Sequence, residues 1–101
     1  MEKKIIHVLR KNDAKNELFL VAVKGWIIGD GMAAHQDPAI PSQWNVVDIS
    51  SGATVVTGDS FHEAMTKYYR LEGKCKEARR HPLYHNVLSI RRGITKVVKL
   101  T

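Results

Sequence analysis

Residues 60–82 read SFHEAMTKYYRLEGKCKEARRHP and carry the clearest structural signal in the chain. Ser60 is followed three residues later by Glu63, a capping box in which each side chain satisfies a backbone N–H at the start of a helix. Pro82 ends that helix near Arg80, because the residue before a proline avoids the helical region. Apolar residues recur between them at helical spacing, at Phe61, Ala64, Met65, Tyr68, Leu71, Cys75 and Ala78. We therefore expect one main helix that packs through this stripe.

Runs of β-branched and aromatic residues precede the helix in two pairs. Residues 4–11 and 17–28 are predicted as strands joined by a turn at 12–16, where two Asn and one Asp tolerate turn geometry. Residues 44–49 and 53–57 predict a second hairpin. Both faces of 17–28 are apolar, which is typical of a central strand. Residues 29–43 contain two glycines and two prolines and predict a long surface loop.

The segment after Pro82 has two interpretations. Residues 83–91 are compatible with a short helix, but alternation in Leu88–Arg91 favours a strand over 86–91, a turn at Arg92-Gly93 and a last strand over 94–100. The element order is then ββββαββ. This order predicts an α+β fold, an antiparallel sheet of five or six strands with one main helix on one face, as a single domain over residues 1–101.

Composition excludes several classes of protein. The chain has 101 residues, of which 44% are hydrophobic and 26% charged, as in soluble globular proteins and unlike disordered segments. The longest mainly apolar run, residues 18–28, contains Lys24 and is far shorter than the ~20 residues of a membrane span. The opening residues do not resemble a signal peptide. These runs predict no membrane partner. A single cysteine cannot form an internal disulfide, so we expect a cytoplasmic protein.

Charge is unevenly distributed along the chain. The formal net charge is +6, but residues 1–65 hold six Lys/Arg and eight Asp/Glu, whereas residues 66–101 hold ten and two. The basic C-terminal third therefore predicts a polyanionic partner, either nucleic acid or an acidic or ribonucleoprotein surface. The alternative explanation is a solvated helix face and a charged edge strand that discourages aggregation.

The candidate binding residues follow from this pattern. Lys67, Arg70 and Lys74 are spaced three and four apart, so they share one helix face. Two tyrosines lie among the charges and offer rings for stacking on unpaired bases. The full predicted interface comprises Lys67, Arg70, Lys74, Arg79, Arg80, Arg91, Arg92, Tyr69 and Tyr84.

The tail HPLYHNVLSIRRGITKVVKL, residues 81–100, resembles the closing hairpin of RelE-type mRNA-cleaving toxins, which are also small, basic and cytosolic. The resemblance covers about a fifth of the chain and implies a small ribonuclease. Those toxins place helices before the sheet, whereas two hairpins open this chain. No catalytic residue is carried over from the family.

Other motifs lack the context that their chemistry requires. Residues 29–34 fit G-x-G-x-x-A, but two prolines follow where a dinucleotide fingerprint needs a helix. Cys75, His81 and His85 fit part of a zinc ligand set, which is one ligand short. No motif links a nucleophile, a base and an orienting group. We therefore expect no cofactor and no metal, and the residues favour a binding protein over an enzyme.

Two binding functions remain open on the sequence alone. The first is a non-enzymatic module that docks nucleic acid or a ribonucleoprotein through the basic helix and C-terminal hairpin, with phosphate contacts dominant. The second is an inhibitor or adaptor, of the type encoded by phages and plasmids, that binds a larger host protein complex. It would use the same basic face, or the 29–43 loop with Trp26 and Trp44 nearby.

Overall fold

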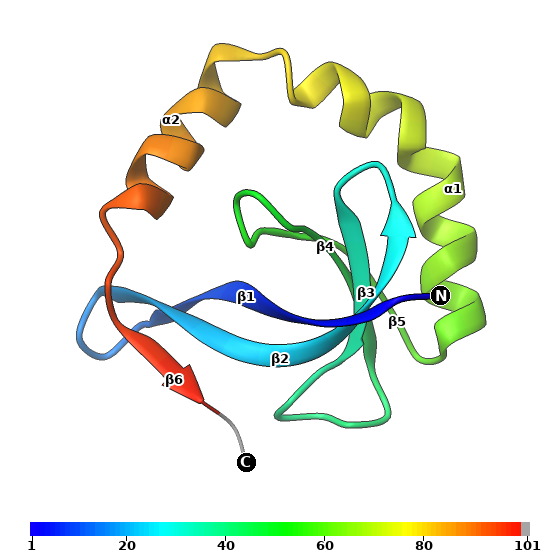
Figure 1. The fold of residues 1–101 in the computed structure, drawn as a ribbon, viewed down its shortest axis with the longest axis horizontal. Coiled ribbons are helices and arrows are strands. Elements are labelled where there is room, and N and C mark those ends of the chain that lie inside the picture. The colour runs from blue at the N-terminus through cyan, green and yellow to red at the C-terminus, as the bar shows by residue number, and fades with distance from the viewer. Residues whose placement is uncertain (100–101) are drawn as a thin grey trace.

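The structure, a computed structural model, describes residues 1–99 and confirms the α+β class. Five strands come first: β1 (Lys3–Asn12), β2 (Glu17–Gly29), β3 (Met32–Gln36), β4 (Trp44–Asp48) and β5 (Thr54–Gly58). Two helices follow, α1 (Phe61–Ala78) and α2 (Pro82–Arg92), and then the short strand β6 (Val97–Lys99). The sheet order is β1-β2-β3-β4-β5, with β6 beside β2 (Figure 1).

Both predicted hairpins form. β1 pairs antiparallel with β2 from Lys3 opposite Trp26 to Asn12 opposite Glu17, and β4 pairs antiparallel with β5. The main-chain N–H of Leu9 in β1 also donates to the Gly52 carbonyl at 2.8 Å, so the sheet curls until β1 meets the β4–β5 turn. Gly52 permits this approach, because a Cβ there would lie 2.8 Å from the His7 carbonyl oxygen.

The predicted loop at 29–43 is wrong in its first half, because Met32–Gln36 is the third strand of the sheet. Gly29, Asp30 and Gly31 all have positive φ and turn the chain back tightly from β2 into β3. Ala33 and Ala34 in β3 are fully buried. Alanine has low strand propensity, so the residues of this segment do not predict a strand. The true loop is 37–43.

The preferred strand at 86–91 is also wrong: these residues belong to α2. His81 caps this helix, since its Nδ1 accepts a hydrogen bond from the Leu83 N–H at 3.1 Å, and Pro82 occupies the first turn, where its missing N–H costs nothing. The predicted turn at Arg92-Gly93 is the end of α2. Residues 81–99 therefore do not form the closing hairpin that carried the resemblance to RelE-type toxins.

The last strand is shorter than predicted and pairs differently. β6 runs parallel to β2, with Val97 opposite Leu20 and Lys99 opposite Ala22, so it is the one departure from antiparallel pairing among residues 1–99. Leu100, the predicted end of this strand, lies outside the described residues.

Two apolar clusters share the sheet. The first fills the inside of the curled sheet, and its buried members are Ile6, Val8, Val21, Val23, Ala33 and Val47. The second lies between the sheet and α1, where Ala64 and Tyr68 are buried against β3, β4 and β5. The predicted stripe of α1 supplies this contact from Phe61 to Cys75, and the Ser60 hydroxyl accepts the Glu63 N–H at 3.0 Å as the helix cap.

Candidate nucleic-acid interface

The outer side of α1 carries the central part of the predicted basic face. Arg70 and Lys74 are exposed one turn apart, and Arg80 is exposed just beyond the helix end. These three cations have no ion-pair partner within residues 1–99. The ring of Tyr69, which is 63% exposed, lies on the same helix.

Lys67 belongs to the same predicted face but is already engaged. Its ammonium group lies 3.0 Å from the Glu63 carboxylate, one turn back along α1, and donates to the Thr57 carbonyl at 3.0 Å. Both contacts are exposed to solvent, where such pairs are weak. Lys67 therefore contributes less free positive charge than Arg70 or Lys74.

Arg79 and Tyr84 turn inward and bind Asp48, the buried residue that ends β4. The Arg79 guanidinium donates to Asp48 Oδ1 through Nη2 at 2.8 Å and Nε at 3.2 Å. The Tyr84 hydroxyl donates to Asp48 Oδ2 at 2.7 Å. Ser51 donates to the same oxygen through its hydroxyl at 2.7 Å and its N–H at 3.1 Å. We call these four residues the Asp48 cluster; it fastens the end of α1 and the start of α2 to the β4–β5 turn.

The electrostatics of the Asp48 cluster favour the ionised carboxylate. Burial alone would raise the pKa of Asp48, but the hydrogen bonds from Ser51, Tyr84 and Arg79 outweigh it and hold the pKa below its usual value. Burial and the bond to this carboxylate raise the pKa of Tyr84. The polar groups of Arg79 and Tyr84 are thus occupied inside the chain.

Arg91 and Arg92 lie on the last turn of α2 instead of on a hairpin. Arg92 is exposed, whereas Arg91 is half-buried and its Nε finds no hydrogen-bond partner among the described residues. Cations in the last turn of a helix also interact favourably with its free carbonyl groups. These two arginines thus lie at the end of α2, whereas Arg70 and Lys74 lie on α1, and Figure 1 shows the two helices as separate elements joined by a short bend.

The weaker motifs do not assemble into sites. Within residues 1–99, no group of three or more His, Cys, Asp or Glu side chains is placed to hold a metal ion. Cys75 lies in the apolar stripe of α1, where burial raises the pKa of its thiol, and His81 is occupied as the cap of α2. The glycines at 29 and 31 lead into β3, whereas a dinucleotide fingerprint leads into a helix.

A hollowed surface lies on the β1–β2 hairpin, separate from the row of cations at Arg70, Lys74 and Arg80. Lys3, Lys24, Trp26 and Trp44 line an open groove of about 450 Å³ beside the start of α1. Trp26 and Trp44 belong to the surface that the sequence offers to a protein partner, whereas Lys3 and Lys24 are not among the predicted binding residues. The signal was available in the hairpin register, since Lys24 and Trp26 alternate along β2 and Lys3 lies directly opposite Trp26.

Comparisons with models of protein families, with curated proteins and with solved structures find no match to this chain. Among residues 1–99, neither helix combines the length and the apolar character needed to cross a membrane.

Proposed function

We propose that this protein is a non-enzymatic binding module that docks nucleic acid through the outer face of α1 and the adjoining Arg80. The observation that carries the proposal is the row of exposed cations at Arg70, Lys74 and Arg80, which have no counterion among residues 1–99. The neighbouring Lys76 differs from these three cations because it has counterions: its ammonium group lies 3.9 Å from the carboxylates of both Asp30 and Glu72. Uncompensated positive charge along one helix suits a phosphate backbone.

The expected recognition depends on phosphate and is indifferent to sequence. Each neutralised phosphate releases condensed counterions, so affinity should fall with salt at a logarithmic slope of about −0.7 per contact on a single strand. Contacts of this type position the ligand without reading its bases. Tyr69 adds an exposed ring beside Arg70 on which one base can stack.

The test compares two double charge reversals that change the net charge equally. Arg70→Glu with Lys74→Glu removes the centre of the face. Lys11→Glu with Lys15→Glu is the matched control, because both lysines are exposed at the far end of the β1–β2 hairpin. Binding of a labelled oligonucleotide is measured by fluorescence anisotropy over a series of salt concentrations. We expect the helix variant to bind weakly and its salt slope to flatten by about 1.4, twice the slope per contact.

Two outcomes would refute the proposal. Equal weakening by both double variants would mean that net charge alone attracts the oligonucleotide. Absence of binding by the unmodified protein at near-physiological salt, for single and double strands alike, would mean that the helix face does not serve nucleic acid.

The second candidate function is an inhibitor or adaptor that binds a larger protein, and the exposure of α2 favours it. Leu83 is 65% exposed and Ile90 is 54% exposed, and α2 carries positive but no acidic side chains. A pulldown from nuclease-treated lysate, repeated with Leu83→Ser and Ile90→Ser together, separates this function from the first. A protein retained after nuclease treatment and lost with the double variant would support the inhibitor or adaptor.

A further inference from the structure

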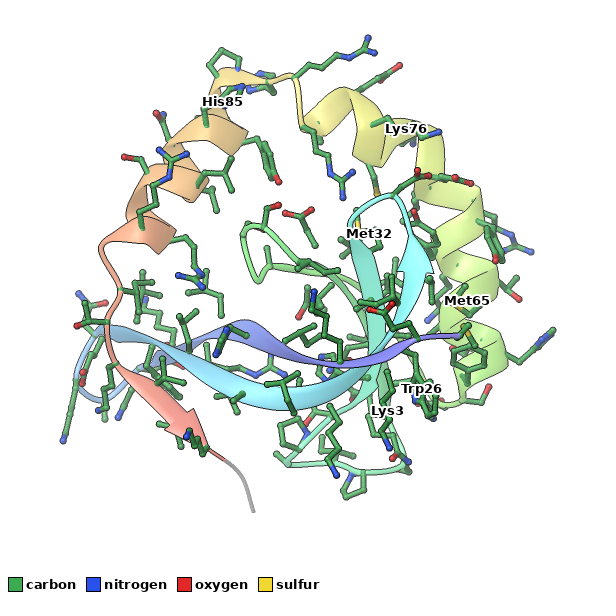
Figure 2. All side chains as sticks on the ribbon, viewed as in Figure 1. Lys3, Trp26, Met32, Met65, Lys76 and His85 are labelled. Carbon is green, nitrogen blue, oxygen red and sulfur yellow. The ribbon has the colours of Figure 1, made fainter. Side chains whose placement is uncertain are left out.

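The outer face of the first hairpin combines aromatic and cationic side chains. Alternation along the strands points Ile6 and Val23 into the core, while their neighbours point outward. The register sets Lys3 opposite Trp26 and Ile5 opposite Lys24, so these four outward residues form one patch. Figure 2 shows Lys3 and Trp26 next to each other near the start of α1.

Aromatic rings extend this patch across the sheet. A second hollow, of about 340 Å³, shares Trp26 and Trp44 with the groove and adds Met1 and Phe61. The Trp44 and Phe61 rings meet edge to face at 5.1 Å between centroids, which fixes their orientation. Met1 is 75% exposed, so apolar surface here remains open to a ligand. We call the two joined hollows the tryptophan groove.

The charge around the tryptophan groove is positive. Lys3 and Lys24 are exposed and make no ion pair within residues 1–99, and no Asp or Glu is among the described residues that line the groove. The Lys3 ammonium lies over the Trp26 ring, 5.1 Å from its centre, a cation–π contact that holds the charge against one face of the ring. A ligand for this groove must therefore be anionic and must present flat or apolar groups.

We infer that the tryptophan groove binds unpaired bases of a single-stranded nucleic acid, with Lys3 and Lys24 on the neighbouring phosphates. This inference rests on the proposed function and narrows its ligand to single strands. Aromatic rings flanked by cations are the usual platform for single-stranded ligands, because every base has a π-face. A duplex cannot use the rings in this way, since its bases are already stacked on one another. It should therefore bind only through the phosphate contacts of α1.

The two tryptophans provide a direct test, because the protein has only two and both line the groove. A twelve-nucleotide uridine oligomer and an RNA duplex of twelve base pairs are titrated separately, and two signals are recorded. Anisotropy of a label on the RNA reports binding anywhere on the protein, and intrinsic tryptophan fluorescence reports occupancy of the groove. We expect both RNAs to raise the anisotropy and only the single strand to quench the tryptophans.

Two double variants and two single variants assign the quenching to named residues. Lys3→Glu with Lys24→Glu should abolish it, whereas Lys11→Glu with Lys15→Glu, of equal charge, should preserve it. Trp26→Ala should weaken single-strand binding at least about five-fold, the lower bound for losing one stacked base. Trp26→Phe keeps a ring and should recover most of that loss, which guards against misfolding of the alanine variant.

The outcomes distinguish the inference from the proposed function. A rise in anisotropy without tryptophan quenching by the single strand would refute the groove and leave the α1 interface intact. No rise in anisotropy with either RNA would refute the proposed function itself. Equal quenching by duplex and single strand would show that the groove does not select unpaired bases and would overturn the inference.

Discussion

The two helices are held to the same sheet by different forces. α1 buries Ala64 and Tyr68 in an apolar cluster against three strands. In α2, in contrast, every residue keeps part of its surface exposed. A hydrogen bond from the Tyr84 hydroxyl to Asp48 attaches this helix to the sheet. Burial of apolar area depends little on pH, whereas a hydrogen bond to a buried carboxylate depends on its ionisation. The position of α2 should therefore respond to changes that leave α1 in place.

Packing beneath α2 is also less complete than packing beneath α1. A cavity of about 230 Å³ lies beside the Asp48 cluster, with Met32 and Val55 on the sheet side and Cys75 and Val87 on the helix side. Apolar atoms around such a cavity forgo part of their packing contacts. α2 thus lies over an incompletely filled space. The polar contact of Tyr84 in its first turn offsets the apolar packing that the helix lacks there.

The largest effect should follow from removing the carboxylate itself. Asp48→Ala leaves the Arg79 guanidinium without its counterion and the Tyr84 hydroxyl without its acceptor, next to an apolar cavity. Breaking a fully buried ion pair costs about 3–5 kcal/mol, and because the Arg79 side chain is 28% exposed, the loss here should lie at the lower end of that range. Chemical denaturation should show this loss in the free energy of unfolding. Asp59→Ala, at an exposed position, should change it by less than about 0.5 kcal/mol.

Acid should reproduce part of that loss. Because the pKa of Asp48 is lowered in the folded state, the unfolded chain binds more protons as pH falls, and folding is weakened. The contribution of Asp48 should be complete at neutral pH, decline below about pH 4 and vanish below the folded pKa. The measurement is the difference in unfolding free energy between the unmodified protein and Asp48→Asn from pH 7 to 2. A difference that stays constant over this range would show that the ionisation of Asp48 does not stabilise the fold.

A smaller change should separate the helices more cleanly. Tyr84→Phe removes one hydrogen bond to a charged acceptor, which is worth about 1.5–3 kcal/mol, and keeps the ring. Amide hydrogen exchange should accelerate in α2, while the buried segment of α1 around Ala64 and Tyr68 stays protected. Equal acceleration in both helices would mean that α2 and α1 open together.

The same contrast explains which elements the sequence could predict. The predicted start and end of α1 agree with the structure, because capping and helical periodicity are local signals. The predicted apolar stripe packs on the sheet from Phe61 to Cys75, whereas Ala78, its last predicted member, is exposed. β3 was missed since its burial arises from neighbouring strands and not from its own residues, Ala33 and Ala34. Within α2, a strand over 86–91 is preferred to a short helix over 83–91 because apolar residues at 88 and 90 imitate a half-buried strand, but the helix is correct and Ile90 is exposed on it.

The sequence predicts which basic residues lie near one another in the candidate site, but not the directions in which their side chains point. Spacing along a helix places Arg70 and Lys74 on one face, and they are exposed as expected. Arg79 belongs to the same basic run, but it binds Asp48, which lies 31 residues away in the sequence. No local pattern reveals that distant carboxylate. The tryptophan groove likewise depends on the arrival of Trp44 beside Trp26, which only the sheet topology determines.

The helix cap offers a change that should affect α1 alone. Ser60→Ala removes the acceptor of the Glu63 N–H and should cost about 1 kcal/mol. Thermal unfolding measures the loss, and Ser60→Asp, which keeps an acceptor at the cap, should restore most of it. Hydrogen exchange should accelerate in the first turn of α1 and stay unchanged in α2. An unaltered melting temperature for Ser60→Ala would indicate that apolar packing of Phe61 and Ala64 suffices to start the helix.

The smallest effect on the free energy of unfolding is expected from changes on the exposed side of α2. They test whether apolar packing contributes to holding this helix. Leu83 and Ile90 are largely exposed, so replacing both with Ser removes little buried apolar area. Exposed substitutions of this kind usually stay within about 0.5 kcal/mol each. Denaturant titration of the double variant should therefore give nearly the midpoint of the unmodified protein. A loss comparable to that of Tyr84→Phe would mean that these side chains pack against the protein in solution. In that case apolar burial would hold α2 as it holds α1, and the two helices would not differ.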